Sequence, residues 1–209
     1  MASAKENILK NIRQSLATPV PQPFPKSITD SQLFPTLKTD LDIVFAEAFT
    51  QLSGQFSFCF GHAEMAAQLE ILATRKKWDK LYCNDTKLRR IFINQQWGRK
   101  WCDQVAECNA SVTFCELLVA RTGTMVLSST ESGGRVPSVY APVHICIAYS
   151  HQLVYDVKDA LVKLQQKYGA NLPSLISFAS GPSRTADIEK TLVTGVHGPK
   201  EVYCFLIDG

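Results

Sequence analysis

From residue 38 onward, short apolar segments alternate with longer segments whose apolar residues recur at helical spacing. This alternation is typical of an α/β sheet with helices on both faces. We therefore predict an open α/β sheet flanked by helices. Helices are expected over residues 40–52, 62–77, part of 86–105, a turn at 116–120, and 157–168. Strands are expected over 55–60, 80–83, 111–114, 124–128, 144–149, 152–155, 175–179 and 202–207, with 91–93 open to either structure.

The composition is that of an ordinary globular chain and excludes disordered, collagen-like and coiled-coil classes. The chain has 209 residues, of which 45% are hydrophobic and 20% charged, so one sizeable core is expected. No apolar stretch approaches the roughly 18–20 residues of a membrane helix. Lys5, Glu6 and Lys10 stand where a signal peptide would be hydrophobic. We expect no membrane span and a cytoplasmic location.

The N-terminal part differs from the rest of the chain. Residues 4–16 carry Ile8, Leu9, Ile12 and Leu16 at helical spacing, and a proline-rich segment follows at 18–25. Such a segment is extended and semi-rigid. We therefore divide the chain into an N-terminal helical arm with a proline-rich linker, residues 1–37, and an α/β domain, residues 38–209. The apolar face of the arm needs cover, from its own chain, a second copy or another partner.

The seven cysteines do not have the spacing of a metal or cluster site. Cys59, Cys146 and Cys204 each lie between two large apolar residues, which is typical of reduced thiols in a core. The other cysteines form no CxxC pair, and the intervals between residues 102, 108 and 115 fit neither zinc nor ferredoxin ligation. We expect no metal or cofactor in this chain.

Eight of the eleven glycines follow residue 120, near the ends of expected strands. In open α/β sheets, ligands bind at the carboxyl ends of the strands. The turn Thr122, Gly123 and Thr124 offers backbone N–H groups and hydroxyls to an oxyanion, or is an ordinary tight turn. Arg135, after two glycines, suits a carboxylate or phosphate because its planar fork binds two oxygens. His144 opens an apolar strand and is either catalytic or structural.

Two later loops extend this pattern. The first directly follows an expected strand and leads into an expected helical turn, so its N–H groups would favour an anion, or it is purely a helix cap. Its candidate ligand-binding residues are Ser180, Gly181, Ser183, Arg184 and Thr185. In the second loop, His197 lies between Gly195 and Gly198, which suits an accessible ring that exchanges a proton, or a turn residue.

A basic segment, residues 75–100, holds nine Lys and Arg against two Asp, a local charge of +7. Tryptophans at 78 and 97 are interleaved with these cations. Such a pattern can bind single-stranded nucleic acid, but it is more typical of solvated helix faces with core tryptophans. Nucleic acid is therefore not the expected partner, and an anionic protein or phosphorylated ligand is an intermediate alternative.

The run SGPSRTADIEKTLVTGVHGP at 180–199, followed by EVYCFLID, resembles the C-terminal signature of the LUD domain, the lactate-utilisation protein C family. The TGT turn at 122–124 and the segment from Arg135 to PVHI at 142–145 resemble its other blocks, in the same order. The resemblance covers roughly residues 38–209. One departure is Arg121, because relatives commonly have an acidic residue there, which puts any charge role at this position in doubt.

The resemblance implies a NagB/RpiA/CoA-transferase-like fold. It also implies a role in bacterial oxidation of L-lactate to pyruvate, beside a cysteine-rich subunit and an iron–sulfur subunit that carry the redox centres. A small anionic ligand would be held by Arg135 and the loop at 180–185, with His144 and His197 as catalytic candidates. The alternative is an independent enzyme or binding protein for a phosphorylated or nucleotide-like small molecule, on fold analogy alone.

Overall fold

The computed structural model describes residues 4–17, 40–131, 133–185 and 193–208. The chain divides into two compact units, residues 1–38 and 39–209. In the first, helix α1 (Ala4–Ala17) matches the expected arm, and Ile8, Leu9, Ile12 and Leu16 are 40–76% exposed. The proline-rich segment lies outside the described residues. No helix in the described ranges is both long and apolar enough to cross a membrane.

Within the described residues of the second unit, six parallel strands form a central sheet in the order β1-β12-β7-β4-β2-β3. A mostly parallel sheet flanked by helices confirms the predicted α/β class. The strands are β1 (Gln55–Cys59), β2 (Leu81–Tyr82), β3 (Trp101–Cys102), β4 (Ala110–Phe114), β7 (Val143–Tyr149) and β12 (Glu201–Ile207).

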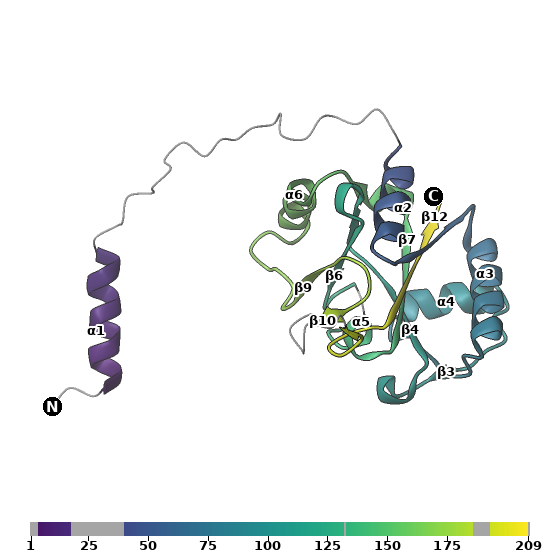
Figure 1. The fold of residues 1–209 in the computed structure, drawn as a ribbon, viewed down its shortest axis with the longest axis horizontal. Helices are drawn as coiled ribbons and strands as arrows, with labels where there is room; N and C mark the ends of the chain where they lie inside the picture. The colour runs from purple at the N-terminus through teal and green to yellow at the C-terminus, as the bar shows by residue number, and fades with distance from the viewer. Residues whose placement is uncertain (1–3, 18–39, 132, 186–192, 209) are drawn as a thin grey trace. The chain divides into compact units, whose positions relative to one another are not determined.

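Helices α3 (His62–Lys76) and α4 (Thr86–Asn94) cover one face of this sheet (Figure 1). Met65, Leu69 and Leu72 recur at helical spacing and place one apolar stripe of α3 in the core. Leu88 and Phe92, four residues apart, do the same for α4. The segment 91–93, which the sequence left open, is therefore helical.

The opposite face is covered by helix α2 (Leu41–Gln51) and by a second sheet of strands in the order β8-β5-β6-β9 (Figure 1). The sequence did not predict this sheet. Its strands are β5 (Leu117–Val119), β6 (Thr124–Ser128), β8 (Leu153–Val154) and β9 (Ile176–Ala179). Helix α6 (Val157–Tyr168) packs on its outer side through Ala160 and Leu164.

Two expected turns of helix are wrong. Residues 117–119 form a strand because Leu118 packs toward the central sheet while Leu117 and Val119 pack toward α6. A strand buried on both faces is apolar throughout and shows no alternation. Residues 184–185, where the sequence predicts the second helical turn, also form a strand, because β10 (Arg184–Thr185) pairs antiparallel with β11 (Val193–Thr194). The continuation of this segment, residues 186–192, lies outside the described residues.

The remaining helical elements are short. Helix α5 (Pro137–Tyr140) begins with a proline, which is well suited to the first helical position because it needs no N–H partner there. Single turns of 3-10 helix join the strands at η1 (Val105–Glu107), η2 (Ala120–Thr122) and η3 (Ser150–Gln152).

Candidate functional site

Several of the predicted site residues line a cavity of about 330 Å³, which we call the loop cavity. It lies between α5, the loop after β9, the loop before β12, and the first residues of β7 and β12. Six candidates from the sequence line it: His144, Ser180, Gly181, Ser183, His197 and Gly198.

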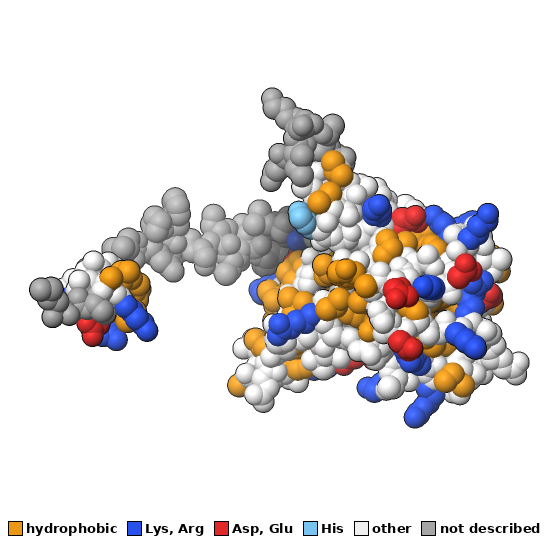
Figure 2. All heavy atoms as spheres, turned by 90° about the horizontal axis from the view of Figure 1, so that it is seen from below, with side chains coloured by type: hydrophobic (Ala, Val, Ile, Leu, Met, Phe, Trp, Pro, Cys, Tyr) orange, Lys and Arg blue, Asp and Glu red, His pale blue; other side chains and the backbone are white. Residues whose placement is uncertain are grey.

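The loop cavity lies at the amino ends of the central strands, not at their carboxyl ends as expected. His144 and Val202 are the second residues of β7 and β12, and both line it. Figure 1 shows α5 and β10 at the edge of the sheet opposite the C-terminal end of β12. In Figure 2, which is viewed from below Figure 1, hydrophobic side chains gather near the centre of this face. One of the two lining loops, which carries Ser180 and Ser183, follows the carboxyl end of β9 in the second sheet, and the other, which carries His197, leads into β12.

His144 is fixed by the register of the central sheet. It pairs with Ser111 of β4 and Val202 of β12, and its side chain is almost completely buried. Its Nε2 atom lies 2.8 Å from Thr113 Oγ1. Burial lowers the pKa of His144 to about 4, so the ring is neutral at pH 7. His144 can therefore donate or accept a hydrogen bond, but it does not supply a positive charge.

A chain of hydroxyls connects the TGT turn with the loop after β9. Thr122 Oγ1 lies 2.8 Å from Thr124 Oγ1, which lies 2.7 Å from Ser180 Oγ. Thr122, Gly123 and Thr124 are not among the residues that line the loop cavity. The two threonines instead hold the hydroxyl of Ser180 in place.

Gly123 and Gly181 allow close backbone contact with α2 and its C-terminal end. Gly123 has φ +55°, and a Cβ there would lie 2.5 Å from the backbone nitrogen of Phe49. Gly181 has φ +74°, and its Cβ would lie 2.6 Å from the carbonyl oxygen of Leu52. A side chain at either position would be strained and would clash. The TGT turn and the loop after β9 are thereby packed against the same helix.

The loops that flank the paired strands β10 and β11 are held together by backbone hydrogen bonds. Ser183 N donates to Pro199 O at 2.9 Å, and Gly195 N donates to Ser183 O at 3.0 Å. A Cβ at Gly198 would lie only 3.0 Å from the side chain of Ser183, so this glycine lets the loops approach. His197 is exposed beside them. This brings Ser183 and His197, 14 positions apart in the sequence, to one cavity.

The two predicted arginines do not line the loop cavity. Arg135 Nε donates to Ser174 Oγ at 3.1 Å, and Arg184 Nη2 donates to Leu52 O at 2.7 Å. Strand β10 carries Arg184 toward the end of α2, and Thr185 and Gly195 likewise lie outside the lining. Among the described lining residues there is no Lys, Arg, Asp or Glu. Hydroxyls and imidazoles, not a guanidinium fork, would therefore recognise a ligand.

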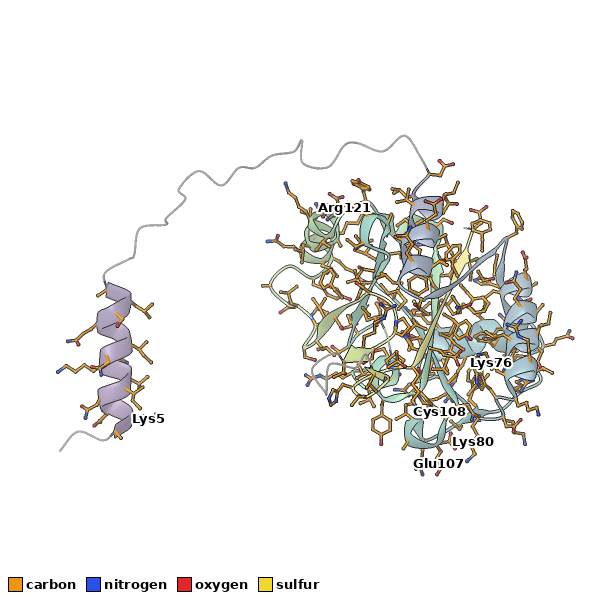
Figure 3. All side chains as sticks on the ribbon, viewed as in Figure 1. Lys5, Lys76, Lys80, Glu107, Cys108 and Arg121 are labelled. Carbon is orange, nitrogen blue, oxygen red and sulfur yellow. The ribbon has the colours of Figure 1, made fainter. Side chains whose placement is uncertain are left out.

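Arg121 pairs with a carboxylate at the start of α6. Its Nε donates to Asp156 Oδ2 at 2.7 Å, and this bond holds the pKa of Asp156 below its usual value. Figure 3 shows Arg121 beside this helix. The positive charge at residue 121 thus serves the packing of α6 against β5.

Sequence reasoning missed Ser138, which lines the loop cavity from α5, and Thr113, which holds His144. Pro137 is a helix-start signal that could have predicted the short helix carrying Ser138. Thr113 could not have been found, because its contact with His144 depends on the strand order.

Three of the nine cations of the basic segment form ion pairs within the described residues, and its tryptophans make core contacts. Lys76 pairs with Glu201, and Lys80 pairs with Glu107; Lys80 and Glu107 are labelled close together in Figure 3. Arg99 pairs with Glu70. Trp78 is buried, and the rings of residues 97 and 101 pack on Phe92. These contacts favour the interpretation of the basic segment as solvated helix faces with core tryptophans over its interpretation as a nucleic-acid site.

The thiols are poor metal ligands as they stand. Six of the seven cysteines are buried, and burial raises the pKa of Cys59, Cys83 and Cys108 to about 11, whereas a metal binds the thiolate. Across the residues that the structure describes, no three His, Cys, Asp or Glu side chains are grouped to hold a metal ion.

Comparison with known proteins gives consistent matches. The LUD domain family model matches residues 44–207. Proteins named Lactate utilization protein C are similar: that of Bacillus velezensis is 34% identical over 113 residues, covering 53% of this chain and 47% of the relative. The Geobacillus sp. protein is 37% identical over 114 residues, with the same coverage. The chain thus spans about half the length of the curated relatives it matches.

A solved structure shares the fold. The crystal structure of a DUF162 family protein from Deinococcus radiodurans superposes with a TM-score of 0.59 at 14% identity. The superposition covers 83% of this chain and 99% of that one. At this identity the likeness concerns the fold alone.

Proposed function

The chain belongs to the LUD domain family, and from this premise we propose that it is a component of an L-lactate utilisation system. The support is the similarity to proteins named Lactate utilization protein C, at 34% and 37% identity over about half of this chain. In the proposed role, it is a cytoplasmic subunit or accessory protein of the system that oxidises lactate to pyruvate.

In this proposal the chain binds and orients a small anionic ligand, and partner subunits carry the electrons. Amino-acid side chains do not accept a hydride, so oxidation of lactate needs a redox group. Six of the seven thiols are buried, and the raised pKa of Cys59, Cys83 and Cys108 does not fit ligation of a cluster, which needs thiolates. We therefore assign the iron–sulfur clusters to iron–sulfur and cysteine-rich partner subunits.

The observation that carries the ligand-binding part is the convergence of Ser180, Ser183, His144 and His197 on the loop cavity. A hydroxy acid such as lactate needs donors for its carboxylate and a partner for its hydroxyl. Serine hydroxyls can donate to the carboxylate, and a neutral imidazole can accept from the hydroxyl. His197, which is exposed at the edge of the cavity, is the candidate for taking up the proton of that hydroxyl.

The role is tested by growth. A strain lacking the gene should fail to grow on L-lactate while growing normally on pyruvate, and the wild-type gene should restore growth. Ser183→Ala and His197→Ala should restore it poorly. Arg135→Ala is the matched control, because Arg135 lies outside the lining of the loop cavity, and should restore growth fully. Normal growth of the deletion strain on L-lactate would remove the proposed role.

The division of labour is tested with the purified chain. Alone and free of metal, it should not oxidise L-lactate with an artificial electron acceptor. Turnover under those conditions would show that the chain is a complete enzyme, and the partner assignment would then be wrong.

A further inference from the structure

A second cavity, of about 470 Å³, lies at the carboxyl edge of the central sheet, and we call it the carboxyl-edge cavity. Phe114 and Tyr149, the last residues of β4 and β7, form part of its wall, and α4 forms another part. It shares no lining residue with the loop cavity. Its volume suits a ligand of mononucleotide size.

The charge on this cavity is positive. Lys87, Arg90, Lys167 and Glu131 are its charged lining residues, a net charge of +2 with histidine neutral. Lys167 Nζ lies 2.8 Å from both Glu116 Oε2 and Glu131 Oε1, so its charge is already balanced. Lys87 and Arg90 have no ion pair within the described residues.

Lys87 and Arg90 are placed to act together. They are three residues apart on α4, so they lie on the same face of the helix, and both line the cavity. The helix is fixed by its N-cap, because Asp85 Oδ1 accepts from Leu88 N at 2.8 Å, and by Leu88 and Phe92 in the core. Two exposed cations on a fixed helix can bind a phosphate, and the guanidinium can hold two of its oxygens.

A row of aromatic rings lies in the same cavity. The ring of Tyr149 stacks on Phe114 at 6.1 Å and on His151 at 5.5 Å. Tyr149 is held by its hydroxyl, which lies 3.0 Å from His62 Nε2. His151, at the open end of the row, is exposed. Such rings offer a planar surface on which a ligand ring can stack.

We propose that the carboxyl-edge cavity binds a phosphorylated small molecule with a planar ring, of the nucleoside monophosphate class. Its phosphate lies on Lys87 and Arg90, and its ring lies against His151. The site is distinct from the loop cavity, and it is independent of the proposed role in lactate utilisation. Its location agrees with the general rule that open α/β sheets bind ligands at the carboxyl ends of their strands.

The test is calorimetric titration of the full chain with AMP and UMP at low salt, beside adenosine and inorganic phosphate. At least one of the two nucleotides should bind at least about tenfold more tightly than adenosine and phosphate alone. The double variant Lys87→Glu/Arg90→Glu should weaken that binding by at least about tenfold, because it reverses both charges at exposed positions. His151→Ala should weaken nucleotide binding and leave phosphate binding unchanged.

Matched controls separate this site from general charge effects and from the loop cavity. Lys158→Glu reverses an exposed charge on α6 outside the cavity and should leave nucleotide binding unchanged, as should Ser183→Ala. Thermal unfolding would verify that each variant is folded. The proposal is overturned if neither nucleotide binds at millimolar concentration, if adenosine or phosphate binds as tightly, or if the double variant binds like the wild type.

Discussion

At the scale of single residues, Gly123 shows how backbone geometry builds the loop cavity. Because it combines φ +55° with contact to the backbone of α2, we expect Gly123→Ala to cost about 1–3 kcal/mol of unfolding free energy. Gly98→Ala is the control, since a Cβ there would meet nothing within 4 Å. Chemical denaturation measures both. Equal stabilities of the two variants would contradict this role of Gly123.

His144 makes the stability dependent on pH. Burial lowers its pKa from the ordinary 6.5 to about 4 in the folded chain, so the unfolded state binds the proton more readily between these two pH values. The contribution of the neutral His144 ring to the free energy of unfolding is therefore complete above the unfolded pKa. It declines as the pH falls toward 4, by about 3 kcal/mol in all. Unfolding measured from neutral to acidic pH should therefore be less steeply pH-dependent in His144→Gln. Identical pH profiles would refute this.

At the scale of elements, α4 depends on its N-cap. Asp85→Ala removes the acceptor for Leu88 N and should cost about 1 kcal/mol, whereas Asp85→Asn keeps an acceptor and should be nearly neutral. Thermal unfolding of both variants provides the comparison. If Asp85→Asn loses as much stability as Asp85→Ala, the carboxylate charge rather than the cap is what matters.

Most elements could be predicted from the sequence because their apolar periodicity matches their burial. The stripe of Leu88 and Phe92 in α4 is one example. The strand at 117–119 could not be predicted, because burial on both faces removes the alternation that identifies a strand. The direction of the Arg184 side chain could not be predicted either, since it depends on the pairing of β10 with β11.

The loops of the candidate site could be predicted from the sequence, but the position of the site relative to the central sheet could not. The loops carrying Ser183 and His197 do line one cavity. That cavity lies at the amino ends of the central strands because the second sheet, which the sequence did not reveal, brings β9 there. Arg135 was expected to join them because its planar fork follows two glycines, but neither residue type nor a neighbouring glycine specifies the direction of a side chain.

At the scale of the whole molecule, the N-terminal arm carries an apolar face that needs cover. Its role is tested by comparing the full chain with a shortened chain that lacks residues 1–38. The exposed face of Ile8, Leu9, Ile12 and Leu16 should promote homo-oligomers of the full chain. Sedimentation of both chains over a range of concentrations tests this. The same number of copies per particle for the full chain and the shortened one would contradict it.

The most direct test of the account is calorimetric titration of the purified chain with L-lactate and pyruvate. We expect at least one of them to bind, binding to be lost in the Ser183→Ala/His197→Ala double variant, and binding to persist in Arg135→Ala. Absence of binding to the wild-type chain at millimolar concentration, or equal binding to the double variant, would contradict the assignment of the loop cavity as the ligand site.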